Sequence, residues 1–291
     1  MPLISFIITY HNEPEAYLRA CIESIQALPF AKEEAEISVV DDGGTLSKTF
    51  DCQLISQEQA GLSVARNTGI SHARGRYIQF VDADDCLVPS AYEAVIEQLR
   101  EERSDVVMFK MTKVLPTGRK KKEFHRPRGI WDGAAFLQHR NLRAAAWGYA
   151  FKRDILGDLW FYPGLFHEDE LFTPLLFLKA KTLVELDAKA YFYRQHPGTI
   201  THSNSPEKVQ KRLDDIHFIL KELRSLEDSL LERRIRQLTV DYIQKMWTLT
   251  CSFKELRRRV KELREEGFLP LPLRCYSLRY LLMAFMTKKV L

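Results

Sequence analysis

The sequence of 291 residues lacks any uninterrupted apolar run of about 18 residues, which argues against a membrane-spanning helix. Its five cysteines are scattered without a CxxC pair, so neither a disulfide scaffold nor a structural zinc site is expected. The start of the chain has no basic region and no small-residue cleavage site, which makes a secretory signal peptide improbable. No internal repeat or low-complexity tract is evident. We therefore expect a folded cytoplasmic protein.

The composition is that of a folded protein whose charge is unevenly distributed. Apolar residues make up 45% and charged residues 28%, and the chain is long enough to bury a core. Residues 205–291 hold 19 Lys and Arg against 12 Asp and Glu, a charge of +7, so residues 1–204 carry −3 of the total of +4. Either the two parts have different partners, or the basic part consists of solvated helix faces.

Strand and helix patterns alternate over the first hundred residues, which predicts an α/β fold with a mostly parallel sheet. After residue 205 the apolar residues recur every three or four positions, as in helices. The predicted strands cover 5–9, 37–40, 53–55, 77–81, 105–114, 149–151 and 183–186. The predicted helices cover 16–28, 62–73, 89–100 and 170–181, with a loop over 119–128.

Acidic residues follow two of the predicted strands, at the sheet edge where such folds bind ligands. Asp82 and Asp84 are one residue apart and can point to a common hard cation such as Mg²⁺ or Mn²⁺. A metal would also relieve the repulsion that Asp85 adds. The alternative is a turn followed by a helix N-cap, since Asp is favoured in both.

The second acidic site, Asp41-Asp42-Gly43-Gly44, could accept hydrogen bonds from a nucleotide base or a ribose, although taken by itself it is explained better by a simple strand-to-turn junction. Between the two acidic sites lie Arg66 and Asn67, on a predicted helix. Arg66 is suited to a forked contact with a carboxylate or phosphate, and the alternative is an exposed basic residue.

Four motifs occur in order along the chain: TYHNEP, VVDDGG, QAGLSVARNTGI and GRYIQFVDADD. Together they resemble the nucleotide-sugar-binding half of glycosyltransferase family 2, which has the GT-A fold, and the resemblance covers roughly residues 3–200. It implies a GT-A catalytic domain over 1–204, with nucleotide-sugar binding to about 115 and the acceptor side over 116–204. Residues 205–291 would form a C-terminal helical region.

The resemblance also implies roles for individual residues on the donor side. The nucleoside, usually uridine, would be lined by Thr9, Tyr10, Asn12 and Asp41 and supported by Asp42, Arg66 and Asn67. Asp82 would lie nearer the ribose, and Asp84 would hold the Mg²⁺ or Mn²⁺ that binds the diphosphate. The segment from Tyr191 resembles a closing Tyr-x-Tyr-Arg motif, in which Arg194 contacts the diphosphate and His196 is a metal ligand in some relatives.

On the acceptor side, the sequence His167-Glu168-Asp169-Glu170 precedes a predicted helix, where acids also serve as caps. The position resembles the ED motif of the family, which implies that Asp169 is the general base and Glu168 supports it. Glu170 is an alternative base. Trp131 and Trp147 are candidates for stacking on a sugar ring, or for anchoring the core.

These expectations define an inverting, metal-dependent glycosyltransferase. Its donor would be a nucleotide sugar, with UDP as the expected nucleotide, and its acceptor a saccharide or lipid-linked saccharide of a cell-surface polysaccharide. The alternatives are a nucleotide-sugar-binding module without turnover and a Mg²⁺-dependent phosphatase of the DxD type. Nucleic-acid binding is not expected, because the basic residues at 119–122 are confined to one loop.

The C-terminal segment 269–289 mixes apolar, aromatic and basic residues and is too short to span a bilayer. It either lies in a membrane interface, which would place the protein peripherally on the inner face of the membrane, or packs on the body or in a dimer.

Overall fold

The computed structural model describes residues 1–44, 46, 50–113, 127–195 and 205–289, and the chain divides into two compact units. Unit 1 consists of Met1–Phe136, Ala144–Gly164 and Glu168–Pro197. Unit 2 consists of Leu137–Arg143, Leu165–His167 and Gly198–Leu291. The C-terminal part of unit 2 thus begins close to the predicted boundary at 205, and two short segments from earlier in the chain join it.

Unit 1 is built on an eight-stranded sheet in the order β3-β2-β1-β4-β9-β6-β10-β8. The first four strands in this order are parallel, while β9 is antiparallel to both of its neighbours and β8 is antiparallel to β10. The strands are β1 (Ile4–Tyr10), β2 (Ala35–Asp42), β3 (Gln53–Gln57), β4 (Tyr77–Asp82), β6 (Val106–Met108), β8 (Pro127–Trp131), β9 (Tyr149–Lys152) and β10 (Leu183–Leu186). A smaller sheet has the order β5 (Cys86–Leu87), β11 (Tyr191–Phe192) and β7 (Met111–Thr112).

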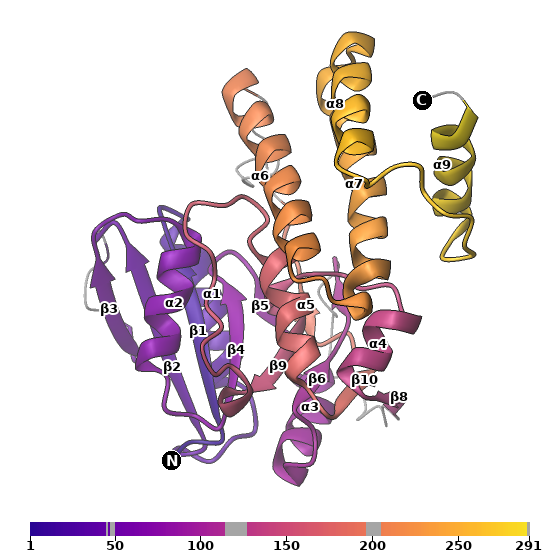
Figure 1. Ribbon diagram of the computed structural model, residues 1–291. Coiled ribbons are helices and arrows are strands. Elements are labelled where there is room, and N and C mark those ends of the chain that lie inside the picture. Colours follow the sequence, from indigo (N-terminus) through magenta and orange to yellow (C-terminus); the bar gives the residue numbers. More distant parts are fainter. Residues whose placement is uncertain (45, 47–49, 114–126, 196–204, 290–291) are drawn as a thin grey trace. The chain divides into compact units, whose positions relative to one another are not determined.

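Helices cover the large sheet, and β1 is buried along its whole length, as expected of a central parallel strand. In Figure 1, α2 lies against β1 and β2, and the packing is so close that a Cβ at Gly69 would clash with Ile7. A Cβ at Gly133 would likewise clash with the Phe177 backbone of α5. The helices of this unit are α1 (Glu15–Gln26), α2 (Leu62–His72), α3 (Pro89–Glu101) and α5 (Asp169–Lys179), and α4 (Gly133–His139) begins in it.

The single strand predicted over 105–114 is wrong. The chain forms β6, leaves the large sheet at Phe109 and Lys110, and then forms β7 in the smaller sheet. At the break, the Phe109 N–H donates to Gly148 O at 3.2 Å and the Lys110 N–H to Ala188 O at 2.7 Å, so the backbone is satisfied outside a regular ladder. Strand β8 and helix α4 were not predicted, and most of the loop predicted over 119–128 lies outside the described residues.

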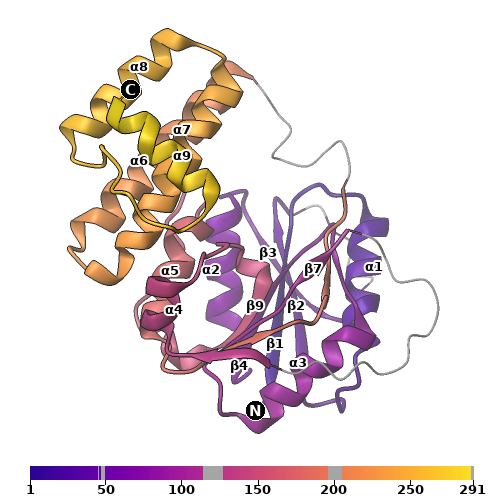
Figure 2. The ribbon, with the colours of Figure 1, turned by 90° about the vertical axis from the view of Figure 1, so that its right-hand side faces the viewer.

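The helical part of unit 2 contains α6 (Pro206–Ser225), α7 (Glu232–Thr250), α8 (Phe253–Glu265) and α9 (Leu278–Lys289). Figure 2 shows these helices together, and α7 contacts α6, α8 and α9. Arg259 is buried among them, and its guanidinium donates to Tyr242 Oη at 2.6 Å and to Asp214 Oδ1 at 2.9 Å. Among the described residues, no helix combines the length and the apolar character needed to cross a membrane.

Candidate active site

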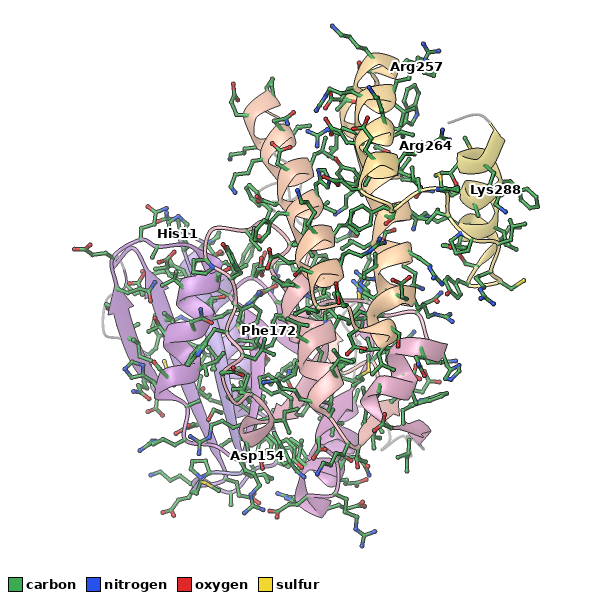
Figure 3. The ribbon with its side chains drawn as sticks, in the orientation of Figure 1. His11, Asp154, Phe172, Arg257, Arg264 and Lys288 are labelled. Atoms are coloured by element: carbon green, nitrogen blue, oxygen red, sulfur yellow. The ribbon has the colours of Figure 1, made fainter. Side chains whose placement is uncertain are left out.

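The carboxyl ends of β1, β2 and β4 bring the predicted donor residues together. In the parallel register, Thr9 of β1 lies opposite Asp82 of β4, and Tyr10 lies opposite Asp41 of β2. Figure 3 shows His11 just beyond this edge of the sheet and Asp154 at the opposite end. Asn12 follows with a φ of 63°, in the left-handed region that Asn tolerates better than most residues. The predicted nucleoside residues thus share one sheet edge.

The two aspartates that end β2 are bound in different ways. Asp42 accepts hydrogen bonds from Gln57 Nε2 at 2.8 Å and from the backbone N–H groups of Ala60 at 2.7 Å and Gly61 at 2.8 Å. It therefore fixes the loop that leads into α2. Asp41 Oδ2 accepts from the Leu46 N–H at 2.9 Å, but its buried Oδ1 has no hydrogen-bond partner among the described residues. Of these two aspartates, Asp41 is therefore the one with a buried oxygen that no described residue binds.

His11 and Glu13 also lie at this edge, and no role was predicted for them from the sequence. His11 Nδ1 donates to Asp42 O at 2.6 Å, which leaves Nε2 as an acceptor 3.2 Å from Asn12 Nδ2. Glu13 Oε2 accepts from the His11 N–H at 2.6 Å. Burial raises the pKa of Glu13, and the charges of Asp84 and Asp82 raise it further. Glu13 thus adds a carboxyl group to the acidic cluster.

The acids after β4 form a turn, in which the Asp85 N–H donates to Asp82 O at 3.0 Å. The helix-cap alternative is not what the structure contains, because α3 begins after Val88. Arg194 holds the turn from the side, with its N–H donating to Asp85 Oδ1 and its Nε to Asp84 O, both at 2.7 Å. The backbone N–H of Asp82 donates to Tyr191 Oη at 3.1 Å. Arg194 therefore contacts the acidic turn, and its predicted contact with the diphosphate stays a prediction.

Arg66 connects this turn to the acidic pair Glu168 and Asp169. Its side chain is buried, contrary to the exposed alternative, and makes ion pairs with Asp82, at 3.3 Å, and with Glu168. The guanidinium also lies over the rings of Phe80 and Phe161, at 5.6 and 5.3 Å from their centroids. A residue of α2 thus connects acids that are far apart in the sequence.

Asn67 acts on the backbone beside this network. Its Nδ2 donates to Phe161 O and its Oδ1 accepts from the Phe161 N–H, both at 2.9 Å. The side chain therefore fixes the segment that leads toward Glu168, and its predicted support of the nucleoside pocket stays a prediction.

The carboxyl groups strongly perturb one another. Burial raises the pKa of Asp82 to about 6, with Arg66 opposing and Asp84 and Glu168 adding to the rise. Burial raises the pKa of Asp85 to about 8, and the charge of Asp82 adds to this. Burial alone would lower the pKa of Arg66, but the carboxylates of Glu168, Asp82 and Asp169 outweigh it and the pKa is raised. Perturbed groups of this kind cluster at functional sites.

The pair Glu168 and Asp169 stands at the start of α5. Glu168 is the N-cap residue but makes no side-chain capping bond, so its carboxylate is committed to Arg66 instead. Asp169 is partly exposed and close enough to Arg66 to raise the pKa of that guanidinium. Since the pair includes one buried, ion-paired carboxylate and one accessible carboxylate, Asp169 is the better placed of the two to meet a substrate.

The three residues before this pair belong to unit 2. The Phe166 N–H donates to Asp215 Oδ2 at 2.8 Å, and the Phe166 ring faces the Arg212 guanidinium at 5.6 Å. His167 has a φ of 62°, and its Nε2 accepts from Lys245 Nζ at 3.0 Å. Burial lowers the pKa of His167 to about 4, and the charges of Lys245 and Arg212 lower it further. His167 is therefore neutral near pH 7.

The acidic turn fits a divalent cation that takes its other ligands from water and a diphosphate. Among the described residues, no three His, Cys, Asp or Glu side chains are arranged to hold a metal by themselves. Mg²⁺, however, is commonly held by one or two carboxylates and substrate phosphates. Asp82 and Asp84 can supply these carboxylates. A bound cation would favour the charged form of Asp82, whose pKa is raised first by burial and then by the charges of Asp84 and Glu168. The predicted ligand His196 lies outside the described residues.

Of the two tryptophans, Trp147 has the burial of a core residue, whereas Trp131 is partly buried. Trp147 is buried, and its ring stacks on Tyr191 with centroids 4.4 Å apart. Trp131 packs edge-on against Phe136 at 6.2 Å.

The sequence is similar to those of known glycosyltransferases. The family described as "Glycosyl transferase family 2" matches residues 5–160, more than half of the sequence, and the chain belongs to this family. The predicted resemblance is thereby confirmed, and the transferase class is favoured over the phosphatase alternative. The protein named "Uncharacterized glycosyltransferase EpsJ" from Bacillus subtilis is 29% identical over 231 residues, which cover 69% of this chain and 63% of EpsJ. The match thus spans less than two thirds of that relative.

Solved structures confirm the predicted GT-A fold. The crystal structure of S. aureus TarS 1–349 in complex with UDP-GlcNAc aligns with a TM-score of 0.70 and 19% identity, covering 99% of this chain and 92% of that one. The mannosyltransferase PcManGT from Pyrobaculum calidifontis, in complex with GDP-Man and Mn²⁺, aligns with a TM-score of 0.55 and 14% identity, covering 98% and 86% of the two chains.

Proposed function

We propose that the chain is an inverting, metal-dependent glycosyltransferase. It moves a sugar from a UDP-sugar to a saccharide or lipid-linked saccharide in cell-surface polysaccharide synthesis. The observation that carries the proposal is the buried guanidinium of Arg66, which pairs with both Asp82 and Glu168. One side chain thereby joins the acids suited to a donor diphosphate with those suited to an acceptor hydroxyl.

On the donor side, Oδ1 of Asp41, which no described residue binds, is an acceptor of the kind that the imide N–H of a uracil requires. Thr9 and Tyr10, at the end of β1, and Asn12, two residues further along the chain, would line the nucleoside beside Asp41. The similarity in fold to a protein crystallised with UDP-GlcNAc supports UDP as the nucleotide. The similarity to a Mn²⁺ complex supports a metal at Asp84, with Asp82 nearer the ribose.

In the proposed reaction, Asp169 takes the proton of the acceptor hydroxyl, and that oxygen attacks the anomeric carbon from the face opposite the diphosphate. The bond from the anomeric carbon to the diphosphate oxygen breaks, the electron pair leaves with UDP, and the configuration inverts. Glu168, held by Arg66, orients the pair at the start of α5. Mg²⁺ or Mn²⁺, when bound, neutralises the charge that develops on the leaving diphosphate.

Two variants test the proposal with purified protein, a panel of UDP-sugars and Mn²⁺. Asp169→Asn should bind UDP as wild type does and lose transfer, because only proton abstraction is removed. Asp84→Ala should lose the Mn²⁺-dependent part of UDP binding, measured by calorimetry, together with transfer. Near-normal turnover in either variant contradicts the role of that residue, and a wild-type protein that binds UDP-sugar but never releases UDP is a binding module.

If the acceptor is carried on a lipid, the enzyme works at the inner face of the membrane.

A further inference from the structure

Helix α9 has apolar residues on two opposite faces, and only one of these faces is buried in unit 2. The buried face consists of Tyr280, Met283, Ala284 and Thr287, none of which exposes more than 8% of its surface. Tyr280 Oη also donates to Pro272 O at 3.0 Å, and Arg264 Nη2 donates to Thr287 O at 2.8 Å. These contacts fix the rotation of α9 about its axis.

The opposite face is a stripe of large apolar side chains in solvent. Leu278 is 74% exposed, Leu282 58%, Phe285 52% and Met286 47%. At about 100° per residue, these four side chains fall within an arc of about 100°, centred roughly 160° from the buried face. A surface helix that is apolar on its solvent side needs a partner for that side. We define these four residues as the α9 stripe.

The charges around the α9 stripe indicate the kind of partner. From residue 267 to residue 291 the chain has four basic residues and no Asp or Glu. On the same helical projection, Arg279 borders one edge of the stripe and Lys288, which Figure 3 labels, lies on the other side. Arg279 pairs with Asp241 at 2.6 Å, which leaves its aliphatic part beside the stripe. The loop before α9 adds the exposed side chains of Leu273 and Arg274.

We infer that the α9 stripe, Leu273 and the flanking cations form a binding surface for an anionic lipid membrane. Apolar side chains enter the boundary between headgroups and acyl chains, while Lys and Arg reach the acidic headgroups. A protein partner would need an apolar surface with acidic groups on both sides of it. An anionic bilayer offers acyl chains and acidic headgroups everywhere on its surface. The inference goes beyond the proposed transfer reaction and does not depend on it, because it concerns binding in the absence of any donor.

Flotation of the full chain with vesicles tests this surface. Wild type should float with vesicles that contain phosphatidylglycerol and much less with pure phosphatidylcholine, and added salt should reduce flotation. The double variant Leu282→Gln/Phe285→Gln should lower the partition coefficient at least about tenfold, because two half-exposed apolar side chains no longer enter the membrane. Arg274→Glu/Lys288→Glu should lower flotation on the anionic vesicles alone.

The matched control is Trp247→Gln/Phe253→Gln, which removes two exposed apolar side chains of the same unit that pack on each other at 4.8 Å. It should float as wild type does. Equal loss in this control, or a wild type that fails to float with anionic vesicles, overturns the inference. If light scattering instead reveals a wild-type dimer that Leu282→Gln/Phe285→Gln converts to a monomer without any vesicle binding, a second copy covers the stripe. Circular dichroism verifies that each variant is folded.

Discussion

The two acidic motifs of the candidate site are held in place in different ways. The turn Asp82–Asp85 is held by residues of unit 1, namely Arg66, Arg194 and Tyr191 through its hydroxyl. The pair Glu168 and Asp169 is held by Arg66 on one side, but the residues just before it are bound within unit 2. The donor acids are therefore held by residues of unit 1, whereas the candidate base closely follows a segment that is bound within unit 2.

Because the two motifs are held differently, substitutions in one unit should not displace both of them equally. The carboxylates after β4 lie at the end of a buried parallel strand, so their position follows from the register of the sheet. Asp169 is the first residue of α5 and follows His167 by two positions, and the His167 ring accepts from Lys245. Changes in the helical unit should therefore affect proton abstraction more than donor binding.

The largest expected effect is on catalysis, from Asp169→Asn. Transfer should fall about 10²–10⁴-fold, the usual contribution of a general base, while UDP affinity stays within about twofold. The matched variant Glu170→Gln, one residue further along α5, should retain most of the activity if Asp169 is the base. The measurement is the initial rate of UDP release with acceptor. If Glu170→Gln is the inactive variant and Asp169→Asn is not, the roles of the two residues are exchanged.

The second largest effect is expected for Arg66→Met, which removes the connection between the two acidic motifs and should lower stability. The substitution leaves the buried Glu168 carboxylate without its cation, which should cost about 3–5 kcal/mol of unfolding free energy. Arg74→Met is the control, because its pair with Glu36 leaves the arginine side chain 74% exposed and should contribute at most about 1 kcal/mol. Urea denaturation compares the two, and equal losses would contradict a special role for Arg66.

A third effect should appear in the pH dependence of stability, through His167. The unfolded histidine titrates near pH 6.5, whereas burial and the charge of Lys245 lower the folded pKa to about 4. Between these values the unfolded chain binds the extra proton, so stability falls as the pH drops from about 6.5 to 4, by at most about 3 kcal/mol. His167→Asn tolerates the positive φ and should flatten this slope.

Urea midpoints measured from pH 4 to 7 test this prediction. The exposed His72→Asn is the control and should leave the slope unchanged. An unaltered slope in His167→Asn would mean that the buried ring does not account for the acid sensitivity. Lys245→Met removes a charge that lowers the pKa of His167, so this pKa should rise, which an NMR titration measures. The same variant should lower kcat while the KM for the donor stays constant.

The donor side of the site could be read from the sequence because it follows from local pattern. Apolar runs that end in acids predict strand ends, and parallel strands bring their carboxyl ends to one edge, which placed Asp41 and Asp82 correctly beside β1. The GT-A fold was implied by the resemblance to glycosyltransferase family 2 that the same motifs carry, and the solved structures confirm it. These signals extend over a few residues each, so no knowledge of distant contacts was needed.

The rest depends on pairings between residues far apart in the sequence, which no local pattern encodes. Arg66 and Glu168 are separated by 102 positions, and nothing near Arg66 distinguishes it from an exposed basic helix residue. Phe166 and His167 are bound in unit 2 by Asp215 and Lys245, which lie 49 and 78 positions later in the sequence. The break at Phe109 and Lys110 depends on the carbonyl groups of Gly148 and Ala188, which accept the hydrogen bonds of these two residues. The sequence prediction therefore continued the strand past Met108, where β6 ends.

The smallest expected effect separates the two neighbouring aspartates of β2. Asp42→Asn turns an acceptor of three hydrogen bonds into a group whose NH₂ faces backbone donors, which should cost about 1–3 kcal/mol of stability. Asp41→Asn should change stability less, because Oδ1 has no partner among the described residues, but should weaken UDP binding. Thermal unfolding and UDP titration of both variants distinguish the roles. If Asp42→Asn lost UDP affinity at unchanged stability, the donor edge would be organised by the ligand and not by the loop before α2.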